Sequence, residues 1–192
     1  MANSSSSSSQ SVPFAALRAR IGWLCHLIRT AAAAYAMWLL AVLAWYWSDS
    51  ATMVQRFGTF LKVDLSGIST TQYALAVAGN LAGWALQAAI SYCIWCQFGT
   101  YLQGRIFTAD AALWMRRVGI AGLAALLFEL VWRHLIIVVM AFHLRLPPHA
   151  LGAWPWAGPF DVLRALFCFA VIGVAWIYEA AAQMADENAQ IV

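Results

Sequence analysis

The chain has 192 residues, of which 64% are hydrophobic and only 10% are charged, and its formal net charge is +3. Soluble domains average about 25% charged residues, so this composition argues against a soluble fold and predicts a chain whose solvent is the lipid bilayer. The weak positive charge, with Lys62 as the single lysine, also argues against a basic nucleic-acid surface, and no direct nucleic-acid binding is expected.

The N-terminal residues 1–12 contain an unbroken serine tract, Ser4 to Ser9. Such a tract buries no apolar surface, so we expect residues 1–12 to be disordered and residues 13–192 to form a single transmembrane domain. A signal peptide is the alternative interpretation of the first apolar run. Its late start and the interruption by Arg29 favour a retained helix.

Four apolar segments cover about residues 21–47, 73–98, 118–144 and 162–182. Each is near the roughly 20 residues that a helix needs to cross the hydrocarbon core. Because lipid offers no partner to backbone N–H and C=O groups, each segment is predicted to be a helix. The predicted fold is all-α: an integral membrane four-helix bundle, up-down-up-down, with short interfacial helices.

Two connections carry further helix signals. Residues 52–62 place Met53, Phe57, Phe60 and Leu61 on one face, which is typical of an amphipathic helix in the membrane interface; an irregular loop is the alternative. In the second connection, Thr108 is a candidate N-cap and Asp110 favours a first helical turn, so the third helix can begin at Ala109.

Arginine and lysine residues near the ends of the predicted helices indicate the orientation of the chain. The N-terminal flank and the second connection carry Arg18, Arg20, Arg105, Arg116 and Arg117. The other two connections carry Arg56, Lys62 and Arg145, with Arg164 just inside the fourth helix. The excess on the first side predicts that both termini lie in the cytoplasm.

Two stretches resemble a known family: Gly104-Arg-Ile-Phe-Thr-Ala-Asp, with the residues that follow to Gly119, and the tail from Glu179 to Val192. They resemble the bacterial membrane-protein family named domain of unknown function 2975. The resemblance implies a multi-pass protein of the bacterial inner membrane without assigned catalytic residues. It also implies a cytoplasmic helix-turn-helix regulator as partner, with Asp186 and Glu187 as the docking surface.

A polar cluster is predicted inside the membrane, because ions in hydrocarbon must face protein or water. Glu129 and Arg133 are spaced to pair on one helix face, and the other expected members are His134, Gln87, Asn80 and Tyr35. One hypothesis makes this cluster a proton or ion relay, or the polar floor of a small-molecule site. The other, which we favour from the sequence, makes it structural, fixing the register of the helices.

Thiols form a second candidate site. Cys93 and Cys96 make a CxxC motif, and Cys25 with His26 is expected near the same membrane face, which would suit a soft metal or a redox pair. With inverted topology the chain would resemble quinone-linked, disulfide-forming membrane enzymes. Cysteine is also a common filler of buried helices, and the spacing alone is a weak signal. The histidines form no pair at matched depth for haem, and no cofactor or metal is predicted.

The leading functional hypothesis is a non-catalytic interaction, regulatory or sensing protein, and it rests on the family resemblance and on the acidic charge of the tail. The sequence also lacks the motifs of soluble enzymes. The alternatives are a transport-like protein for small solutes, protons or ions, and a membrane thiol or metal redox protein. Gly79 and Gly83 form a small-xxx-small pair that permits close helix packing within one chain or in a homo-oligomer.

Overall fold

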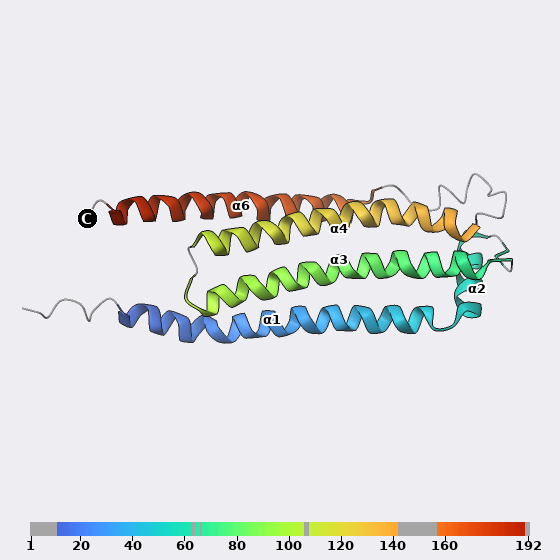
Figure 1. Cartoon of the computed structure of the whole chain (residues 1–192), viewed down its shortest axis with the longest axis horizontal. Helices are drawn as coiled ribbons and strands as arrows, with labels where there is room; N and C mark the ends of the chain where they lie inside the picture. The colour runs from blue at the N-terminus through green and yellow to red at the C-terminus, as the bar shows by residue number, and fades with distance from the viewer. Residues whose placement is uncertain (1–10, 63, 66, 106–107, 142–156, 191–192) are drawn as a thin grey trace, which may run out of the picture.

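The structure is a computed structural model that describes residues 11–62, 64–65, 67–105, 108–141 and 157–190. These residues form α1 (Ser11–Trp47), α2 (Ser50–Leu61), α3 (Thr70–Leu102), α4 (Ala109–Ala141) and α6 (Pro159–Gln190). The four long helices pack antiparallel as a bundle, and α2 crosses one end of it (Figure 1). The predicted all-α, up-down-up-down bundle is therefore confirmed.

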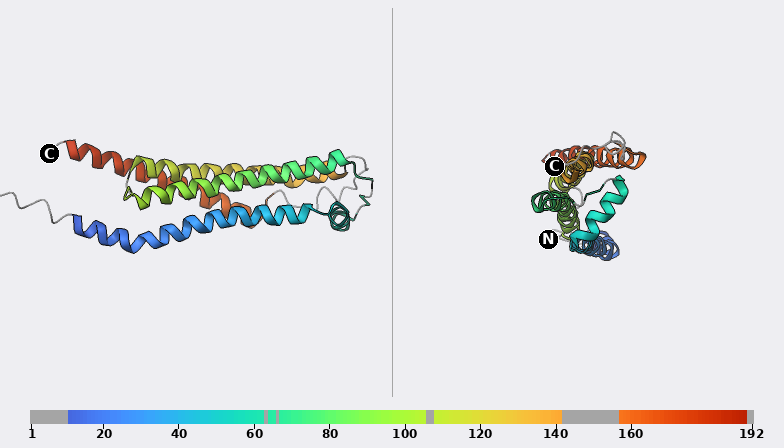
Figure 2. Two further views of the ribbon diagram at one scale, coloured as in Figure 1. Left: turned by 60° about the horizontal axis from the view of Figure 1, so that its bottom comes forward. Right: turned by 90° about the vertical axis from the view of Figure 1, so that its right-hand side faces the viewer.

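The long helices form an arc in chain order: α1 packs on α3, α3 on α4, and α4 on α6. The end-on view in Figure 2 shows this arc, with α1 and α6 at its two ends and α2 lying across its open side. Consequently α6 is a peripheral helix that is held chiefly by α4.

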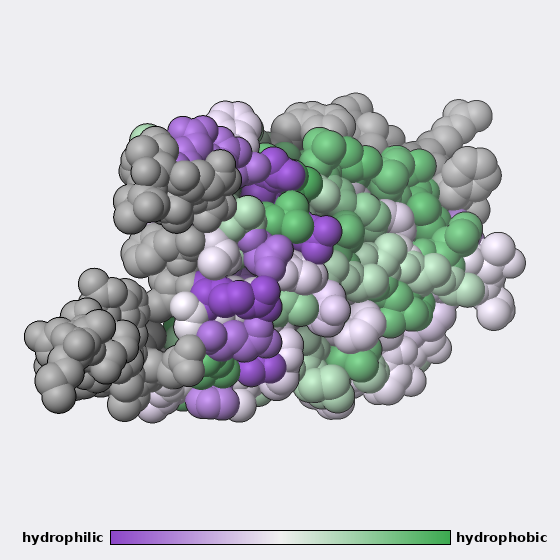
Figure 3. Space-filling model, turned by 60° about the vertical axis from the view of Figure 1, so that its left-hand side comes forward, coloured by the Kyte–Doolittle hydropathy of each residue, from purple (hydrophilic) through white to green (hydrophobic). Residues whose placement is uncertain are grey.

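Each long helix contains a segment that is long and apolar enough to cross a membrane: Gly22–Trp47, Thr70–Leu102, Ala109–Met140 and Pro159–Met184. Large apolar side chains point outward along these segments, among them Trp45, Leu127 and Phe167, which are 71%, 65% and 68% exposed. Figure 3 shows apolar side chains along the helix shafts and hydrophilic ones at the end where α1 begins and α6 ends. This is the architecture of a multi-pass membrane protein.

The helices extend beyond the predicted apolar segments, since hydropathy marks only the part of a helix that suits lipid. The first helix begins at Ser11 rather than near residue 21. The third begins at Ala109, as the N-cap at Thr108 predicted, ahead of the apolar run that starts at 118. The fourth continues to Gln190 instead of ending near 182. Residues 1–10, predicted to be disordered, and residues 142–144, predicted to end the third helix, lie outside the described residues.

Polar caps explain two of these helix ends. Thr108 accepts a hydrogen bond from the Ala111 N–H at 3.3 Å, as the N-cap prediction requires. At the start of α3, Ser69 and Gln72 form a capping box, which the sequence analysis missed. The Gln72 Nε2 also donates to the Val139 carbonyl at 3.1 Å and so ties the start of α3 to the end of α4.

The amphipathic helix predicted for residues 52–62 is present as α2, and the loop alternative is wrong. Met53, Phe57 and Leu61 are buried at successive intervals of four residues and join the apolar core at this end of the bundle. Phe60, which was placed on the same face, is 48% exposed, because the buried stripe is only one residue wide. Asp49 caps the helix start, and Lys62 ends it with a left-handed backbone, φ 54°.

Glycines let the long helices approach closely. A Cβ on Gly79 would lie 1.9 Å from the Trp132 ring, and one on Gly83 would lie 3.3 Å from Phe128. The rings of Phe128 and Trp132 stack with centroids 6.0 Å apart, so together they fill the notch in α3. The small-xxx-small pair therefore serves packing within the chain, and the predicted homo-oligomer loses the observation on which it was based.

We predict that Gly79→Ala lowers the free energy of unfolding by about 1–3 kcal/mol, because the indole of Trp132 must leave its place on α3. Gly99→Ala on the same helix is the matched control, since a Cβ there meets nothing within 4 Å. Thermal unfolding in detergent micelles measures both. Equal stability of the two variants would contradict the packing described above.

The cap of α2 predicts a dependence on pH. Hydrogen bonds from the Thr52 hydroxyl and the Thr52 N–H hold the pKa of Asp49 below its ordinary value. The capping contribution is therefore complete above the ordinary aspartate pKa and is lost as the pH falls through the lowered one.

We expect the Thr52 amide resonance of the protein in micelles to shift only in acid, below about pH 4. Asn is an equally good N-cap but does not ionise, so Asp49→Asn should keep α2 and abolish this titration. A titration that persists in Asp49→Asn would assign the effect to another group.

Candidate functional site

Four charged side chains form a continuous ion network between α4 and α6: Glu129, Arg133, Asp161 and Arg164. Arg133 binds both carboxylate oxygens of Asp161, Nη1 to Oδ2 at 2.9 Å and Nη2 to Oδ1 at 3.0 Å. Its Nη2 also donates to Glu129 Oε1 at 2.6 Å. Arg164 Nη1 donates to the other oxygen, Glu129 Oε2, at 2.6 Å. Two acids and two bases leave the network with no formal net charge.

Local sequence positions each member of the ion network. Glu129 and Arg133 are four residues apart and so lie on one face of α4. Asp161 lies in the first turn of α6, where a carboxylate is favoured by the helix dipole, and it also accepts a hydrogen bond from the Gly158 N–H at 2.9 Å. Proline at the first helical position starts α6 at Pro159. The network therefore anchors the beginning of α6 to α4.

Burial is graded across the ion network. The side chain of Asp161 is 7% exposed and that of Arg133 is 25% exposed, whereas Glu129 and Arg164 are 37% and 42% exposed. Ions at this depth are tolerated only when they are paired and hydrogen-bonded. Each carboxylate oxygen accepts from a guanidinium group, so every member has its charge compensated.

A cavity of about 510 Å³ lies beside the ion network, in the half of the bundle nearer to α2. Its apolar wall comes from α1, α2, α3 and α4 and consists of Leu39, Val42, Leu43, Tyr46, Trp47, Met53, Phe57, Trp84, Trp132 and Ile136. Its polar wall consists of Asn80, Gln87, Glu129 and Arg133. Because Glu129 and Arg133 belong to both features, an occupant of the cavity would touch the network that holds α6.

Hydrogen bonds leave part of the cavity wall available to a ligand. Trp84 Nε1 donates to the Ala36 carbonyl of α1 at 2.9 Å, and Asn80 Nδ2 donates to Ala76 of its own helix at 2.8 Å. Among the described residues, the half-buried Gln87 amide has no hydrogen-bond partner and is open to the cavity. The Nε1 of Trp132 has no partner either, but this atom is fully buried and is not open to the cavity.

The structure brings together four of the six residues predicted for the polar cluster. Glu129 pairs with Arg133, and the amides of Asn80 and Gln87 line the same cavity. Tyr35 does not join them: it is 48% exposed on α1, beside Trp38. His134 does not line the cavity either, and its Nδ1 lies 3.0 Å from the Leu130 carbonyl of its own helix.

Asp161 and Arg164 are the members that the sequence analysis missed. Both stand at the start of the fourth apolar run, whereas the polar cluster was expected near mid-membrane on the other helices. In fact the start of α6 lies beside Arg133 of α4. Arg133 is eight residues before the last residue of α4, which corresponds to about 12 Å along the helix axis. An acid and a base three residues apart at the start of an apolar run were the available signal.

The predicted thiol site is dispersed over different environments. Cys25 is buried, with 2% of its surface exposed, whereas His26 is exposed and Cys93 and Cys96 are half-buried. The three cysteines are free thiols. Within the described part of the chain, no three His, Cys, Asp or Glu side chains are grouped so as to hold a metal ion. Redox chemistry at these residues stays a prediction, as does transport through the polar cluster.

The predicted partner-docking residues are at the end of α6. Glu187 is exposed, whereas the side chain of Asp186 lies outside the described part of the structure. Arg116 of α4 pairs with Glu179 of α6 at 3.7 Å and holds the helix just before this tail.

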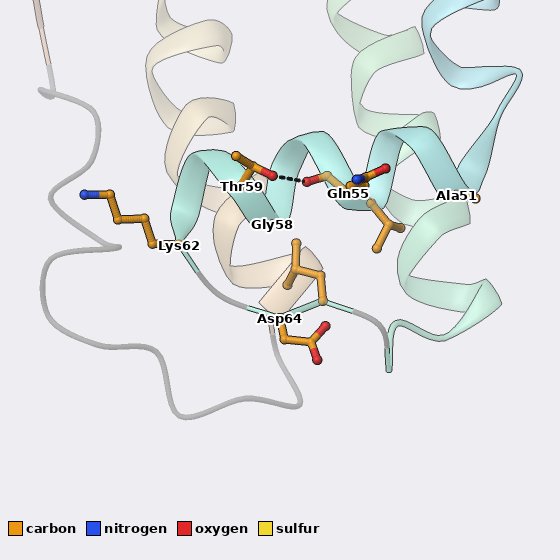
Figure 4. Close-up of a pocket in the computed structure, with 8 residues that line it drawn as sticks. Ala51, Gln55, Gly58, Thr59, Lys62 and Asp64 are labelled. Atoms are coloured by element: carbon orange, nitrogen blue, oxygen red, sulfur yellow. Dashed lines mark hydrogen bonds between the residues drawn. The ribbon is translucent and has the colours of Figure 1, made fainter.

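A second hollow, of about 560 Å³, lies over the other face of α2. Figure 4 shows its lining, in which Thr59 donates to the Gln55 carbonyl within α2 and the Lys62 side chain points away from the helix. Its lining comes from α2 and the residues that follow it, so it has no connection with the ion network.

Comparison with known proteins gives no match: no family model fits the chain, and no curated protein or solved structure is similar to it. The fold and the site define the class, a small multi-pass membrane protein with four candidate spans and an ion-paired helix junction. The resemblance to domain of unknown function 2975 stays a prediction.

We predict that Arg133→Leu lowers the free energy of unfolding by about 3–5 kcal/mol, because it leaves the buried carboxylate of Asp161 without a counter-ion. Arg116→Leu is the matched control on the same helix. It removes a half-exposed contact with Glu179 and should cost only about 0–1 kcal/mol. Thermal unfolding in micelles distinguishes the two.

The double variant Arg133→Leu, Asp161→Leu separates charge burial from general damage at this junction. It removes one base and one acid and keeps the neutral pair of Glu129 with Arg164. We expect it to recover most of the stability that Arg133→Leu loses. A double variant as unstable as the single one would show that the network acts by shape rather than by charge.

Proposed function

We propose that this protein is a non-catalytic membrane sensor. The cavity is its receptor site. Binding there changes the position of α6, and α6 transmits this change to the end of the bundle where α1 begins and α6 ends. This proposal develops the interaction and sensing hypothesis drawn from the sequence and gives it a location.

One observation carries the proposal: Glu129 and Arg133 line the cavity and also hold the start of α6. A molecule in the cavity would contact these two side chains and shift their positions. Because Glu129 and Arg133 are paired with Arg164 and Asp161, the α6 members of the ion network, such a shift would move the start of α6. Ligand binding and the position of α6 are therefore linked, because the same two side chains contact both the ligand and α6.

The packing of α6 supports its role as the moving part. Besides the ion network, α6 contacts α4 where Cys168 and Ile172 meet Gly122 and Gly119, and where Glu179 pairs with Arg116 through half-exposed side chains. Beyond this contact α6 continues without a break to Gln190. A tilt at its beginning would thus displace its exposed tail, including Glu187.

We further propose a bacterial inner-membrane location with both termini in the cytoplasm. The arginine distribution supports this orientation, since Arg105 and Arg116 belong to the end of the bundle where α1 begins and α6 ends. The tail of α6 would then face the cytoplasm, where the family resemblance implies a helix-turn-helix regulator as its partner.

The test measures whether the cavity and the tail of α6 communicate. Spin labels at Glu187→Cys on α6 and Trp23→Cys on α1, with the native cysteines replaced by alanine, report the distance between the two helix ends. Leu39→Trp fills the cavity from α1, and Leu24→Trp is the matched control, because Leu24 is an exposed residue of the same helix outside the cavity.

We expect Leu39→Trp to shift or broaden the distance distribution in lipid nanodiscs and Leu24→Trp to leave it unchanged. Arg133→Leu serves as the positive control, because it removes the bidentate contact with Asp161 at the start of α6. If Arg133→Leu moves the tail but a folded Leu39→Trp protein does not, cavity and helix are uncoupled, and the sensor proposal is wrong.

A further inference from the structure

We infer that the cavity binds an uncharged amphipathic molecule from the membrane, one with a planar head that accepts hydrogen bonds. This inference names the ligand class for the receptor site and so rests on the proposed function. It is carried by the charge, the free donors, the shape and the opening of the cavity.

Charge excludes an ionic head. Among the described residues, the only ionised groups that line the cavity are Glu129 and Arg133, and each is already paired within the neutral ion network. An anionic or cationic head would have to break one of these bonds and leave a buried charge uncompensated, which is costly in a membrane interior. An uncharged head avoids that cost.

An unpaired amide favours a hydrogen-bond acceptor. Among the described residues, the Gln87 amide lines the cavity, is half-buried and has no hydrogen-bond partner. Its nitrogen can donate two hydrogen bonds. Carbonyl or ether oxygens on a ligand would accept them.

The shape of the lining favours a flat ring. Five of the lining side chains are aromatic: Tyr46, Trp47, Phe57, Trp84 and Trp132. Aromatic walls bind planar groups by stacking and edge contacts, and they add to the burial of apolar surface. The volume of about 510 Å³ is in the range typical of small-molecule sites.

The opening of the cavity points to lipid as the source. Val42 and Tyr46 line the cavity and are also 40% and 38% exposed on the side of α1, within the span Gly22–Trp47. A molecule dissolved in the hydrocarbon can therefore reach the polar wall without leaving the membrane. Its apolar chain would remain among the lipid tails.

The probe is a benzoquinone with one decyl chain and three methyl groups, so that no ring position is left for addition of a cysteine thiol. Decyltrimethylammonium and decyl sulfate carry the same chain on a cationic and an anionic head. Each is titrated against the full-length protein in micelles, and binding is followed by the rise in unfolding temperature.

We expect the quinone to stabilise the protein and the two ionic probes to do so at least tenfold more weakly. Gln87→Leu removes one donor and should weaken quinone binding roughly fivefold to tenfold, the effect of one hydrogen bond. Leu39→Trp should abolish binding, whereas Leu24→Trp should bind as the unmodified protein does.

Three results would overturn the inference. Tighter binding of either ionic probe would reject the uncharged head. Equal quinone binding in Leu39→Trp and Leu24→Trp would assign the effect to the micelle. No stabilisation by any probe would leave the cavity without this ligand class.

None of these results bears on the link between cavity and α6, which the spin labels measure separately. Conversely, quinone binding that is lost in Leu39→Trp but leaves the tail of α6 unmoved would support the site and reject the sensor.

Discussion

Arg133 and Asp161 form the bidentate ion pair that fixes where α6 begins on α4. Because the long helices form an arc, α6 has α4 as its main neighbour. Glu129 and Arg164 extend this contact and balance its charge. The start of α6 and the proposed link between the cavity and the α6 tail both depend on this ion network.

The same arc leaves an open side, and α2 lies across it (Figure 2). Met53 and Phe57 of α2 line the cavity together with residues of α1, α3 and α4. The close contact of Trp132 with Gly79 borders this cavity, because the Trp132 ring also forms part of its wall.

Much of the fold could be predicted from the sequence, because lipid leaves a helix little choice. The four apolar runs, the amphipathic spacing of Met53 and Phe57, and the N-cap at Thr108 were sufficient for every helix described. Helix ends were less accurate. Polar residues such as those after Met184 continue a helix without any hydropathy signal.

The site was predictable only in part, because pairing within a helix is visible in sequence and pairing between helices is not. The spacing of Glu129 and Arg133 identified their contact, but the partners Asp161 and Arg164 depend on how far α6 is displaced along α4. Tyr35 was wrongly assigned to the cluster for a related reason. The sequence indicates its depth in the membrane but not the direction in which its side chain leaves α1.

The ion network also has a consequence for the biogenesis of the protein. Each of the two helices carries one acid and one base within a single turn, Glu129 with Arg133 on α4 and Asp161 with Arg164 on α6. Either segment can thus leave the translocation machinery as a self-neutralised unit. Assembly then becomes an exchange of counter-ions between two already inserted helices, and neither helix has to hold a lone charge in lipid.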